Sequence, residues 1–398
     1  MKYLFVACLL CLSVLSAVAK VPAMNKIRLT NNWEYLKGDL GGIWEAVRPA
    51  APGSSEAVPI WQPVTLPHCF NAEDAVDPDV NYYEGPGWYK TLLAIDNPYR
   101  NGRIVLDFDG AGQKTDVYVY TTHVGSHVGG YDSWNVDITD AVKAFLGSKD
   151  AERFKGKVPL SIRCDNSRDL EMIPSDLADF NIYGGLYRYL NLVYLPEVSF
   201  EQIRLESSLS SNLKEGILKV KTSFYNPEDI RKADVTVSVY DADRKPVFSK
   251  TLEGILPLGD QLLAKMKIKN PVLWDVDVPQ LYTCELTVKT PDQTFTTEER
   301  FGFRHTEFKD KGPFFLNGKR LLLRGTHRHE DHAGVAQAMT EDMMRREMRM
   351  MKDMGVNFIR LGHYQQSEII LDLCDELGIL VWEEIPWCRG GLGGENLY

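Results

Sequence analysis

Three short segments in the C-terminal quarter of the sequence gather residue types that bind or transform polar ligands. They are Arg324-Gly-Thr-His-Arg-His-Glu-Asp-His332, Asn357-Phe-Ile-Arg-Leu-Gly-His-Tyr364, and the pair Glu383 and Glu384. Each follows a run of apolar residues typical of a buried strand. Because barrel active sites are built at the carboxyl ends of parallel strands, we expect the three segments to converge on one polar site.

The histidines of the first segment allow three interpretations. His327, His329 and His332 carry the side chains of a possible metal site. Their spacing is not that of a helical pair, however, and Arg328 between them opposes a cation. We therefore favour a polar ligand-binding loop, with structural hydrogen bonding as the second interpretation and a metal site as the third. The sequence predicts no certain cofactor, and a divalent metal is unsupported.

A fourth polar segment lies far upstream, at Asp179-Phe-Asn-Ile-Tyr-Gly-Gly-Leu-Tyr-Arg188. Two adjacent glycines beside charged residues, among predicted strands, permit a sharply bent backbone. One interpretation is a loop that reaches toward a neighbouring part of the protein. The other is a tight turn that carries surface charges.

The elements that must position the three C-terminal segments alternate between strands and helices. Thr340 and Ser367 are suitable N-caps, and Gly355 and Gly378 suit the position just past a helix end. Buried strands that alternate with helices predict right-handed βαβ units on a parallel sheet. The predicted order is strand 320–324, helix 340–354, strand 356–361, helix 367–377 and strand 379–382.

The sequence between Trp33 and Phe303 consists mainly of short alternating segments. Apolar and polar residues that alternate between turn-forming residues are typical of half-buried antiparallel strands. Two such sets predict a jelly-roll β-sandwich followed by an immunoglobulin-like β-sandwich of about seven strands. The clearest predicted strands are 103–109, 116–120, 134–138, 158–163 and 190–194 in the first set, and 217–224, 233–240, 246–252, 261–268 and 282–288 in the second.

The composition is that of an ordinary soluble multidomain protein. The chain has 398 residues, of which 44% are hydrophobic and 25% charged, and its net charge is −10. At roughly 100–200 residues per domain, two to four domains are expected. The acidic balance argues against nucleic acid as a partner, because that surface requires a basic patch.

The N-terminus predicts a secretory signal peptide over residues 1–19. Lys2 precedes an apolar run, and Ala17-Val-Ala19 supplies a small-residue cleavage pattern, so the mature chain is expected to begin at Lys20. The run is shorter than the roughly 20 residues of a spanning helix, so no stable membrane span is expected. We expect an exported protein, periplasmic or extracellular. A lipoprotein signal ending at Cys8 is the less favoured alternative.

Five cysteines would remain after removal of the signal peptide. Their number is odd, they are scattered, and no pair has the CxxC spacing of a zinc site. We therefore predict buried free thiols at Cys69, Cys164, Cys284, Cys374 and Cys388.

Motifs along the chain, taken in order, resemble glycoside hydrolase family 2, which includes β-galactosidases, β-glucuronidases and β-mannosidases. The motifs are weak singly and specific together. They are Leu66-Pro-His68, Gly87-Trp-Tyr89, Gly184-Gly-Leu-Tyr-Arg188, Leu273-Trp-Asp275 with Pro279 to Tyr282, Phe301-Gly-Phe-Arg304, Leu316-Asn-Gly-Lys319, Arg324-Gly with His329-Glu330, and Asn357 to Tyr364.

The resemblance implies a jelly-roll β-sandwich, an immunoglobulin-like β-sandwich and the first three strands of a (β/α)8 TIM barrel. The corresponding ranges are 1–19 for the signal peptide, 20–198 for a sugar-binding jelly roll, 199–305 for the immunoglobulin-like domain and 306–398 for an incomplete barrel.

The resemblance also implies a substrate site. Asp179 matches the acidic residue that the first domain lends to the sugar subsite, and His329 and His363 match sugar-binding histidines. Glu384, at the third strand end, joins them as a substrate-binding candidate. The expected substrate is the terminal β-linked sugar of an oligosaccharide or polysaccharide. A β-galactosidase-like, retaining hydrolase is the first hypothesis, with β-glucuronidase or β-mannosidase specificity as the alternative.

Some residues depart from the family pattern. Leu361, Gly362 and Gln365 differ from the residues usual around the His-Tyr pair. The magnesium-ligating pattern of some β-galactosidases is not visible after Trp382, which leaves a metal requirement unsupported.

A complete barrel needs about 250 residues, more than the sequence offers after Thr306. By resemblance, the acid/base and nucleophile glutamates lie on later strands, so we expect both beyond Tyr398 and expect this chain alone to be inactive. The competing hypothesis is a non-catalytic carbohydrate-binding protein made of the two sandwiches.

Overall fold

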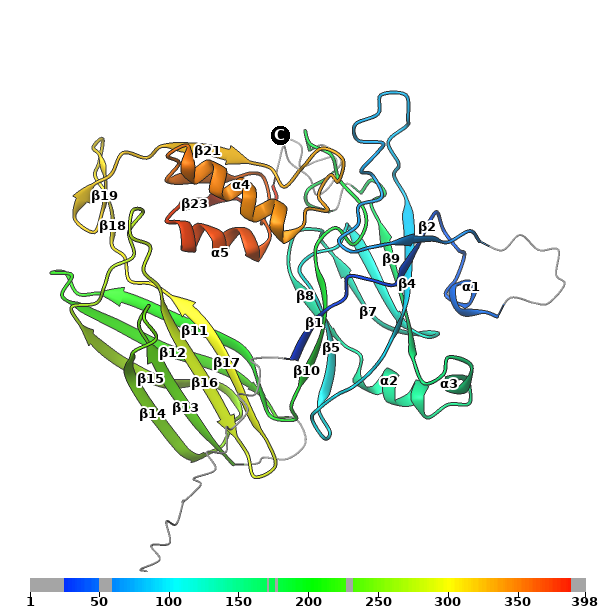
Figure 1. Ribbon diagram of the computed structural model, residues 1–398, viewed down its shortest axis with the longest axis horizontal. Coiled ribbons are helices and arrows are strands. Elements are labelled where there is room, and N and C mark those ends of the chain that lie inside the picture. The colour runs from blue at the N-terminus through cyan, green and yellow to red at the C-terminus, as the bar shows by residue number, and fades with distance from the viewer. Residues whose placement is uncertain (1–24, 50–58, 170–171, 176–177, 227–231, 388–398) are drawn as a thin grey trace, which may run out of the picture.

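The computed structural model describes residues 25–49, 59–169, 172–175, 178–226 and 232–387 (Figure 1). The predicted signal peptide, Cys8 and Cys388 lie outside these residues. The described chain forms two β-sandwiches and a parallel strand–helix segment, so the predicted fold class is confirmed. We call these parts the first sandwich (β1 to β10), the second sandwich (β11 to β17) and the barrel segment (β21 to β23).

The first sandwich packs a four-stranded sheet on a six-stranded sheet around one apolar core. Alternation sets the inward face: in β6, Thr115, Val117 and Val119 are buried and their neighbours are partly exposed. The sheets are β1 (Asn25–Arg28), β10 (Leu190–Leu195), β5 (Arg103–Phe108) and β8 (Trp134–Asp137), and β3 (Gln62–Val64), β2 (Trp33–Lys37), β4 (Pro86–Leu93), β9 (Val158–Asp165), β6 (Lys114–Val119) and β7 (Thr122–Val128). Three short helices lie at its margin: α1 (Trp44–Val47), α2 (Thr139–Leu146) and α3 (Asp150–Arg153).

The second sandwich has seven antiparallel strands in two sheets, as the alternation predicted. In β12 every second residue from Gly216 to Phe224 is buried, which is the period of a strand with one face in a core. The sheets are β11 (Ser199–Leu209), β12 (Glu215–Tyr225) and β15 (Gly259–Lys269), and β14 (Pro246–Ile255), β13 (Ala233–Tyr240), β16 (Tyr282–Lys289) and β17 (Thr294–Phe301). A small sheet of β18 (Thr306–Phe308), β19 (Phe314–Leu316) and β20 (Lys319–Arg320) leads to the barrel segment.

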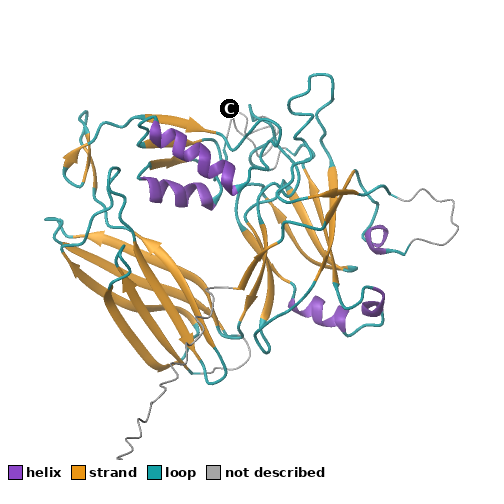
Figure 2. Cartoon of the chain, in the orientation of Figure 1, coloured by secondary structure: helices purple, strands orange, loops and turns teal. Residues whose placement is uncertain are grey.

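The barrel segment contains three parallel strands in sequence order, with two helices against one face (Figure 2). Ile359 and Leu361 of the middle strand pack with Met344 and Met348 of the first helix in one apolar cluster. The elements are β21 (Gly325–Arg328), α4 (Glu341–Asp353), β22 (Phe358–Leu361), α5 (Glu368–Leu377) and β23 (Leu380–Glu383).

The predicted helix boundaries rest on caps that the structure contains. The Thr340 hydroxyl accepts a hydrogen bond from the Met343 amide, and the Ser367 hydroxyl accepts one from the Ile369 amide. Gly378 ends α5 in the left-handed region, at φ 70°. A side chain there would be strained and would also meet the backbone of Val276, so glycine is required.

The predicted first barrel strand at 320–324 is wrong. Arg320 belongs to the short antiparallel β20, and the parallel strand begins later, at Gly325. Leu322 is 68% exposed, so the apolar run that suggested a buried strand is a connection across the surface.

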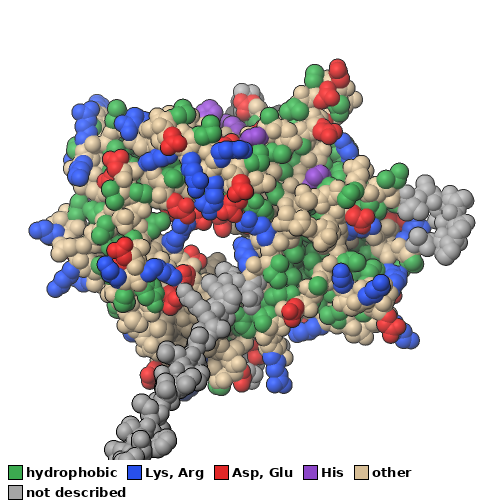
Figure 3. All heavy atoms as spheres, in the orientation of Figure 1, with side chains coloured by type: hydrophobic (Ala, Val, Ile, Leu, Met, Phe, Trp, Pro, Cys, Tyr) green, Lys and Arg blue, Asp and Glu red, His purple; other side chains and the backbone are tan. Residues whose placement is uncertain are grey.

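A chain of ion pairs joins the three parts of the molecule. Figure 3 shows charged side chains gathered above an opening between these parts. Carboxylates of α4 and α5 pair with arginines from both sandwiches, and alternating charges continue along the helices. The pairs are Arg28–Glu341 at 3.0 Å, Arg345–Glu341 at 2.7 Å, Arg345–Glu376 at 3.5 Å, Arg300–Glu376 at 2.7 Å and Arg300–Asp372 at 2.6 Å.

Four of the five predicted thiols are described, at Cys69, Cys164, Cys284 and Cys374. All four are free and buried, as predicted. Within the described residues, none of the helices has the length and apolar character needed to cross a bilayer.

Candidate active site at the carboxyl ends of the barrel strands

The predicted polar segments lie at one edge of the barrel segment. His329 directly follows β21, His363 follows β22 by two residues, and Glu384 directly follows β23. The three strands are parallel, so all three side chains start from the same edge of the sheet. Figure 3 shows histidine side chains gathered at the corresponding upper edge of the molecule.

The first sandwich contributes an aromatic side chain to this edge. The ring of Phe180 has its centroid 5.5 Å from that of His329 and 5.8 Å from that of His363. The two imidazole rings are themselves 5.3 Å apart, centroid to centroid. Residues about 150 positions apart in the chain therefore form one cluster across the boundary between two domains.

Asp179, next to Phe180, is exposed and lies within electrostatic reach of His329. Burial lowers the pKa of His329, and the neighbouring His363 and His327 rings lower it further, whereas Asp331 and Asp179 act in the opposite direction. A pKa below the ordinary value keeps His329 neutral at pH 7. A neutral imidazole offers one donor and one acceptor, which suits a hydroxyl ligand.

Glu384 is the centre of a polar triad at the open side of the strands. Its carboxylate accepts from Arg360 Nε at 2.6 Å and from His363 Nδ1 at 2.8 Å. Burial raises the pKa of Glu384, but the hydrogen bonds from His363 and Arg360 outweigh that effect and hold the pKa below its ordinary value. Glu384 is therefore an ionised group that orients His363, rather than a carboxylic acid ready to deliver a proton.

A buried ion pair fixes the loop that carries His329. Arg188 donates to Glu330 from Nε at 2.8 Å and from Nη2 at 2.5 Å, and the side chains are 2% and 0% exposed. The guanidinium also donates to the carbonyl oxygens of Tyr131 and Gln365, each at 2.7 Å. The other oxygen of Glu330 accepts from the Ser367 amide at 3.1 Å. Arg188 thus connects the first sandwich with the loops after β21 and β22.

The structure separates other candidate residues from this cluster. Glu383 accepts from the Gln366 amide at 3.3 Å, away from Glu384, in keeping with the alternation along a strand. The ring of His327 lies 6.1 Å from that of His329, and His332 contacts the carbonyl of Ala333. In the part of the chain that the structure describes, no three His, Cys, Asp or Glu side chains are grouped to hold a metal ion.

Sequence reasoning identified Asp179, His329, His363 and Glu384 but missed Phe180 and the Arg188–Glu330 pair. An aromatic residue such as Phe180 in a β-rich segment is usually expected to lie in the core. Nothing in its spacing indicates a contact with a second domain. The one available signal for the pair was a charged Arg188 between the apolar residues Tyr187 and Tyr189, because a buried charge needs a partner.

The chain has two β-sandwiches followed by barrel strands, and the first sandwich contributes side chains to the site at the strand ends. This arrangement defines a modular (β/α)-barrel protein. Three sequence models match in the same order. They are the sugar binding domain of glycosyl hydrolases family 2 at 40–196, a model described simply as glycosyl hydrolases family 2 at 198–304, and the family's TIM barrel domain at 307–392. The chain belongs to glycoside hydrolase family 2.

Several relatives carry β-glucuronidase names. A Formosa agariphila protein with a provisional β-glucuronidase name is 38% identical over 93% of this chain and 42% of its own length. A β-glucuronidase of Bacteroides fragilis is 33% identical over 82% of this chain and 47% of its own length. The crystal structure of Parabacteroides merdae β-glucuronidase with glycerol in its active site is 99% identical, with a TM-score of 0.92, over 94% of this chain and 48% of its own. This chain thus spans about half the length of these relatives.

Relatives with β-galactosidase names also match this chain. A β-galactosidase of Thermoanaerobacter pseudethanolicus also matches, but at 28% identity over 92% of this chain and 47% of its own length. The β-glucuronidases above match at greater identity.

Proposed function

We propose that this chain forms the substrate-binding part of a β-glucuronidase, which releases glucuronate from the non-reducing end of an oligosaccharide or polysaccharide with retention of configuration. The observation that carries the proposal is the 99% identity to the Parabacteroides merdae β-glucuronidase over 94% of this chain. The strand-end cluster of His329, His363 and Phe180 supports it, because a rim of neutral and charged donors beside an aromatic ring suits a sugar.

In this proposal, Asp179, His329 and His363 bind hydroxyl groups of the terminal sugar. Glu384 is the fourth proposed substrate-binding residue, and through its bond to His363 Nδ1 it also fixes the orientation of that ring. Phe180 supplies an apolar surface beside the two imidazoles. The arrangement fits a polyhydroxylated ring that needs several directional hydrogen bonds.

Retaining hydrolysis needs two carboxyl groups about 5–5.5 Å apart, one as acid/base and one as nucleophile. The described carboxylates nearest the rim have other roles: Glu330 is paired with Arg188, Glu384 with Arg360, and Glu383 accepts from the Gln366 amide. We therefore propose that both catalytic glutamates come from barrel strands other than β21, β22 and β23.

Hydrolysis is tested with aryl β-D-glucuronide and aryl β-D-galactoside. The 398-residue chain is compared with a fusion in which the region of the Parabacteroides merdae enzyme beyond the match follows this chain. We expect no turnover by the chain alone and glucuronide-specific turnover by the fusion. Preference for galactoside would contradict the specificity, and turnover by the chain alone, abolished by Glu384→Gln, would assign Glu384 to catalysis.

Binding is tested on the chain alone, by titration with D-glucuronic acid. His363→Asn and Asp179→Asn should each weaken binding by about tenfold or more, because each removes a charged or directional hydrogen bond. His123→Asn, on β7 of the first sandwich, is the matched control and should bind like the parent. Undiminished binding by both site variants would place the sugar elsewhere.

We also propose that the protein is exported and begins at Lys20. N-terminal sequencing of protein secreted from a Gram-negative host tests this. An intact Met1 or a lipid-modified Cys8 would contradict it.

A further inference from the structure

A short chain of hydrogen bonds joins a loop of the first sandwich to the loop that carries His329. The Tyr183 hydroxyl donates to Asp331 Oδ2 at 2.7 Å, and Asn181 Nδ2 donates to the same hydroxyl at 3.2 Å. Asn181 directly follows Phe180, and Asp331 lies two residues after His329. The bonds therefore connect the two sides of the proposed sugar site. We call Asn181, Tyr183 and Asp331 the interdomain latch.

The first-sandwich end of the latch is held firmly in its own domain. Tyr183 is 3% exposed, and its carbonyl accepts from Gln113 Nε2 at 3.1 Å. The neighbouring Ile182 carbonyl accepts from the Tyr82 hydroxyl at 2.8 Å. Burial raises the pKa of Tyr183 above its ordinary value, so its hydroxyl stays protonated and remains a donor at neutral pH. The latch therefore holds Asp331 against a fixed point.

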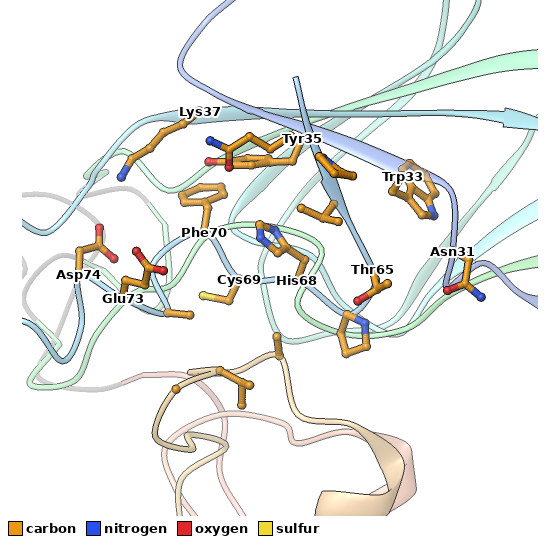
Figure 4. A pocket seen from close by; sticks show the side chains of 18 of the residues that line it. Asn31, Trp33, Tyr35, Lys37, Thr65, His68, Cys69, Phe70, Glu73 and Asp74 are labelled. Carbon is orange, nitrogen blue, oxygen red and sulfur yellow. The ribbon is translucent and has the colours of Figure 1, made fainter. Parts of the chain in front are cut away.

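The barrel-segment end of the latch lies on a more open stretch of chain. Asp331 is exposed, as are residues 333–334. Val335 and the segment 65–74 of the first sandwich both line a hollow of about 930 Å³ (Figure 4). Solvent on one side and the hollow on the other leave this stretch room to move. The bond from Tyr183 restrains it.

A buried thiol lies under the same loop. Cys69 is 4% exposed and packs with Tyr183 and Ala336 in one apolar cluster. Its thiol accepts from the Gln337 backbone amide, and burial raises its pKa to about 12. Figure 4 shows Cys69 on the first-sandwich segment that faces the loop of the barrel segment across the hollow. Movement of the loop would admit a reagent and return the thiol pKa toward its ordinary value, so Cys69 reports on the latch.

We propose that Tyr183 and Asp331 are positioning residues, whose hydrogen bond holds the two loops of the proposed sugar site at a fixed separation. At this separation Asp179, Phe180 and His329 face one ligand. The proposal rests on the proposed function, and neither positioning residue has to touch the sugar. Because coupling between two equilibria is reciprocal, a sugar that bridges the two loops should in turn strengthen the latch.

The latch is tested by the rate at which iodoacetamide labels Cys69 in the 398-residue chain, measured by peptide mass spectrometry. Tyr183→Phe and Asp331→Ala each remove the bond and should raise this rate about five- to tenfold. Asp331→Asn retains an acceptor oxygen and should restore nearly the parent rate. The matched control is Tyr240→Phe, which removes a hydroxyl that donates to Glu285 in the second sandwich, and it should leave the rate unchanged.

Cys164 and Cys284, buried in the two sandwiches, report on global unfolding in the same samples. A rise at Cys69 alone supports the proposal. If the buried change Tyr183→Phe raises labelling at all three thiols, the variant unfolds and Asp331→Ala, at an exposed position, decides. The proposal is overturned if Asp331→Ala leaves the Cys69 rate unchanged, or if Asp331→Asn raises it as much as Asp331→Ala does.

The link to the sugar site is tested by titrating the same variants with D-glucuronic acid. Tyr183→Phe and Asp331→Ala should bind about five- to tenfold more weakly than the parent, and Asp331→Asn should restore binding. The Asp331 charge raises the pKa of His329, so its loss keeps that ring neutral and does not account for weaker binding. Saturating sugar should also slow the labelling of Cys69 in the parent.

The two readouts separate failure of the latch from failure of the proposed function. If the parent does not bind D-glucuronic acid, the proposed function fails and the labelling of Cys69 alone decides the latch. If the parent binds it and Asp331→Ala binds it equally well, the positioning role is overturned.

Discussion

The rings of Tyr131 and Tyr364 stack with their centroids 3.9 Å apart and their planes 17° apart, across the boundary between the first sandwich and the barrel segment. The Tyr364 hydroxyl accepts from the Glu330 amide at 3.0 Å and lies 3.5 Å from His329 Nδ1. One tyrosine thus joins the domain interface to the loop that carries a proposed sugar-binding histidine.

Tyr364→Phe should keep the stack and lose the hydroxyl. The Glu330 amide would then be buried without its acceptor, so the free energy of unfolding should fall by about 1–3 kcal/mol. Urea unfolding measures this. Tyr240→Phe, whose hydroxyl donates to Glu285 at 3.3 Å in the second sandwich, is the matched control and should cost less. Equal losses would contradict the special role of the Tyr364 hydroxyl.

Breaking the Arg188–Glu330 pair should be among the most destabilising single changes. Glu330→Gln leaves a buried guanidinium without its counter-charge, and we expect a loss of about 3–5 kcal/mol in the free energy of unfolding. The double variant Arg188→Met with Glu330→Leu should recover part of that loss, because no unpaired charge remains. The loss in the double variant is compared with the summed losses of Arg188→Met alone and Glu330→Leu alone. Equality of the two would show that the pair does not act as a unit.

Stability should depend on pH through His68. Its pKa in the folded protein is about 4, below the ordinary 6.5, so between these values the unfolded chain binds more protons than the folded chain. The free energy of unfolding should therefore fall as pH is lowered from 6.5 to 4, with a contribution of at most about 3 kcal/mol from this residue. His68→Asn should lose that part of the pH dependence in urea unfolding. A variant with the parent's pH profile would show that another group is responsible.

The ion-pair chain between the domains should be sensitive to salt. Arg300→Gln removes two pairs to α5, and because the arginine side chain is 37% exposed we expect a loss of about 1 kcal/mol or less at low ionic strength. In 1 M NaCl, where the Debye length is about 3 Å, the difference between variant and parent should disappear. Thermal unfolding at both salt concentrations measures this. A loss that persists in high salt would assign the effect to packing.

The sequence predicted the sandwiches well because strand alternation is a local signal. The buried positions of β12 follow directly from the alternating residues 217–224. The first barrel strand was misplaced because a run of leucines at 321–323 resembles a buried strand, whereas its exposure depends on where the chain turns next. Thr340 and Ser367 placed the helix starts well, since capping depends only on neighbouring residues.

The candidate site likewise contains some residues whose positions the sequence predicts and others whose positions it does not. His329 and His363 follow strands, so their common edge was predictable from topology. Phe180 and Arg188 come from a different domain, and their contacts depend on how two folded units dock. No period or motif within either segment encodes that docking, and the 142 residues between Arg188 and Glu330 conceal the pairing.

The Arg188–Glu330 pair also has a consequence for biosynthesis. At about 5–20 residues per second, the ribosome adds Glu330 roughly 7–28 s after Arg188. Until Glu330 has been added, the Arg188 guanidinium of the first sandwich has no counter-charge and remains in contact with water. When β21 docks on the first sandwich, both charges are desolvated together. The loop that carries His329 therefore becomes fixed only after the first sandwich has folded.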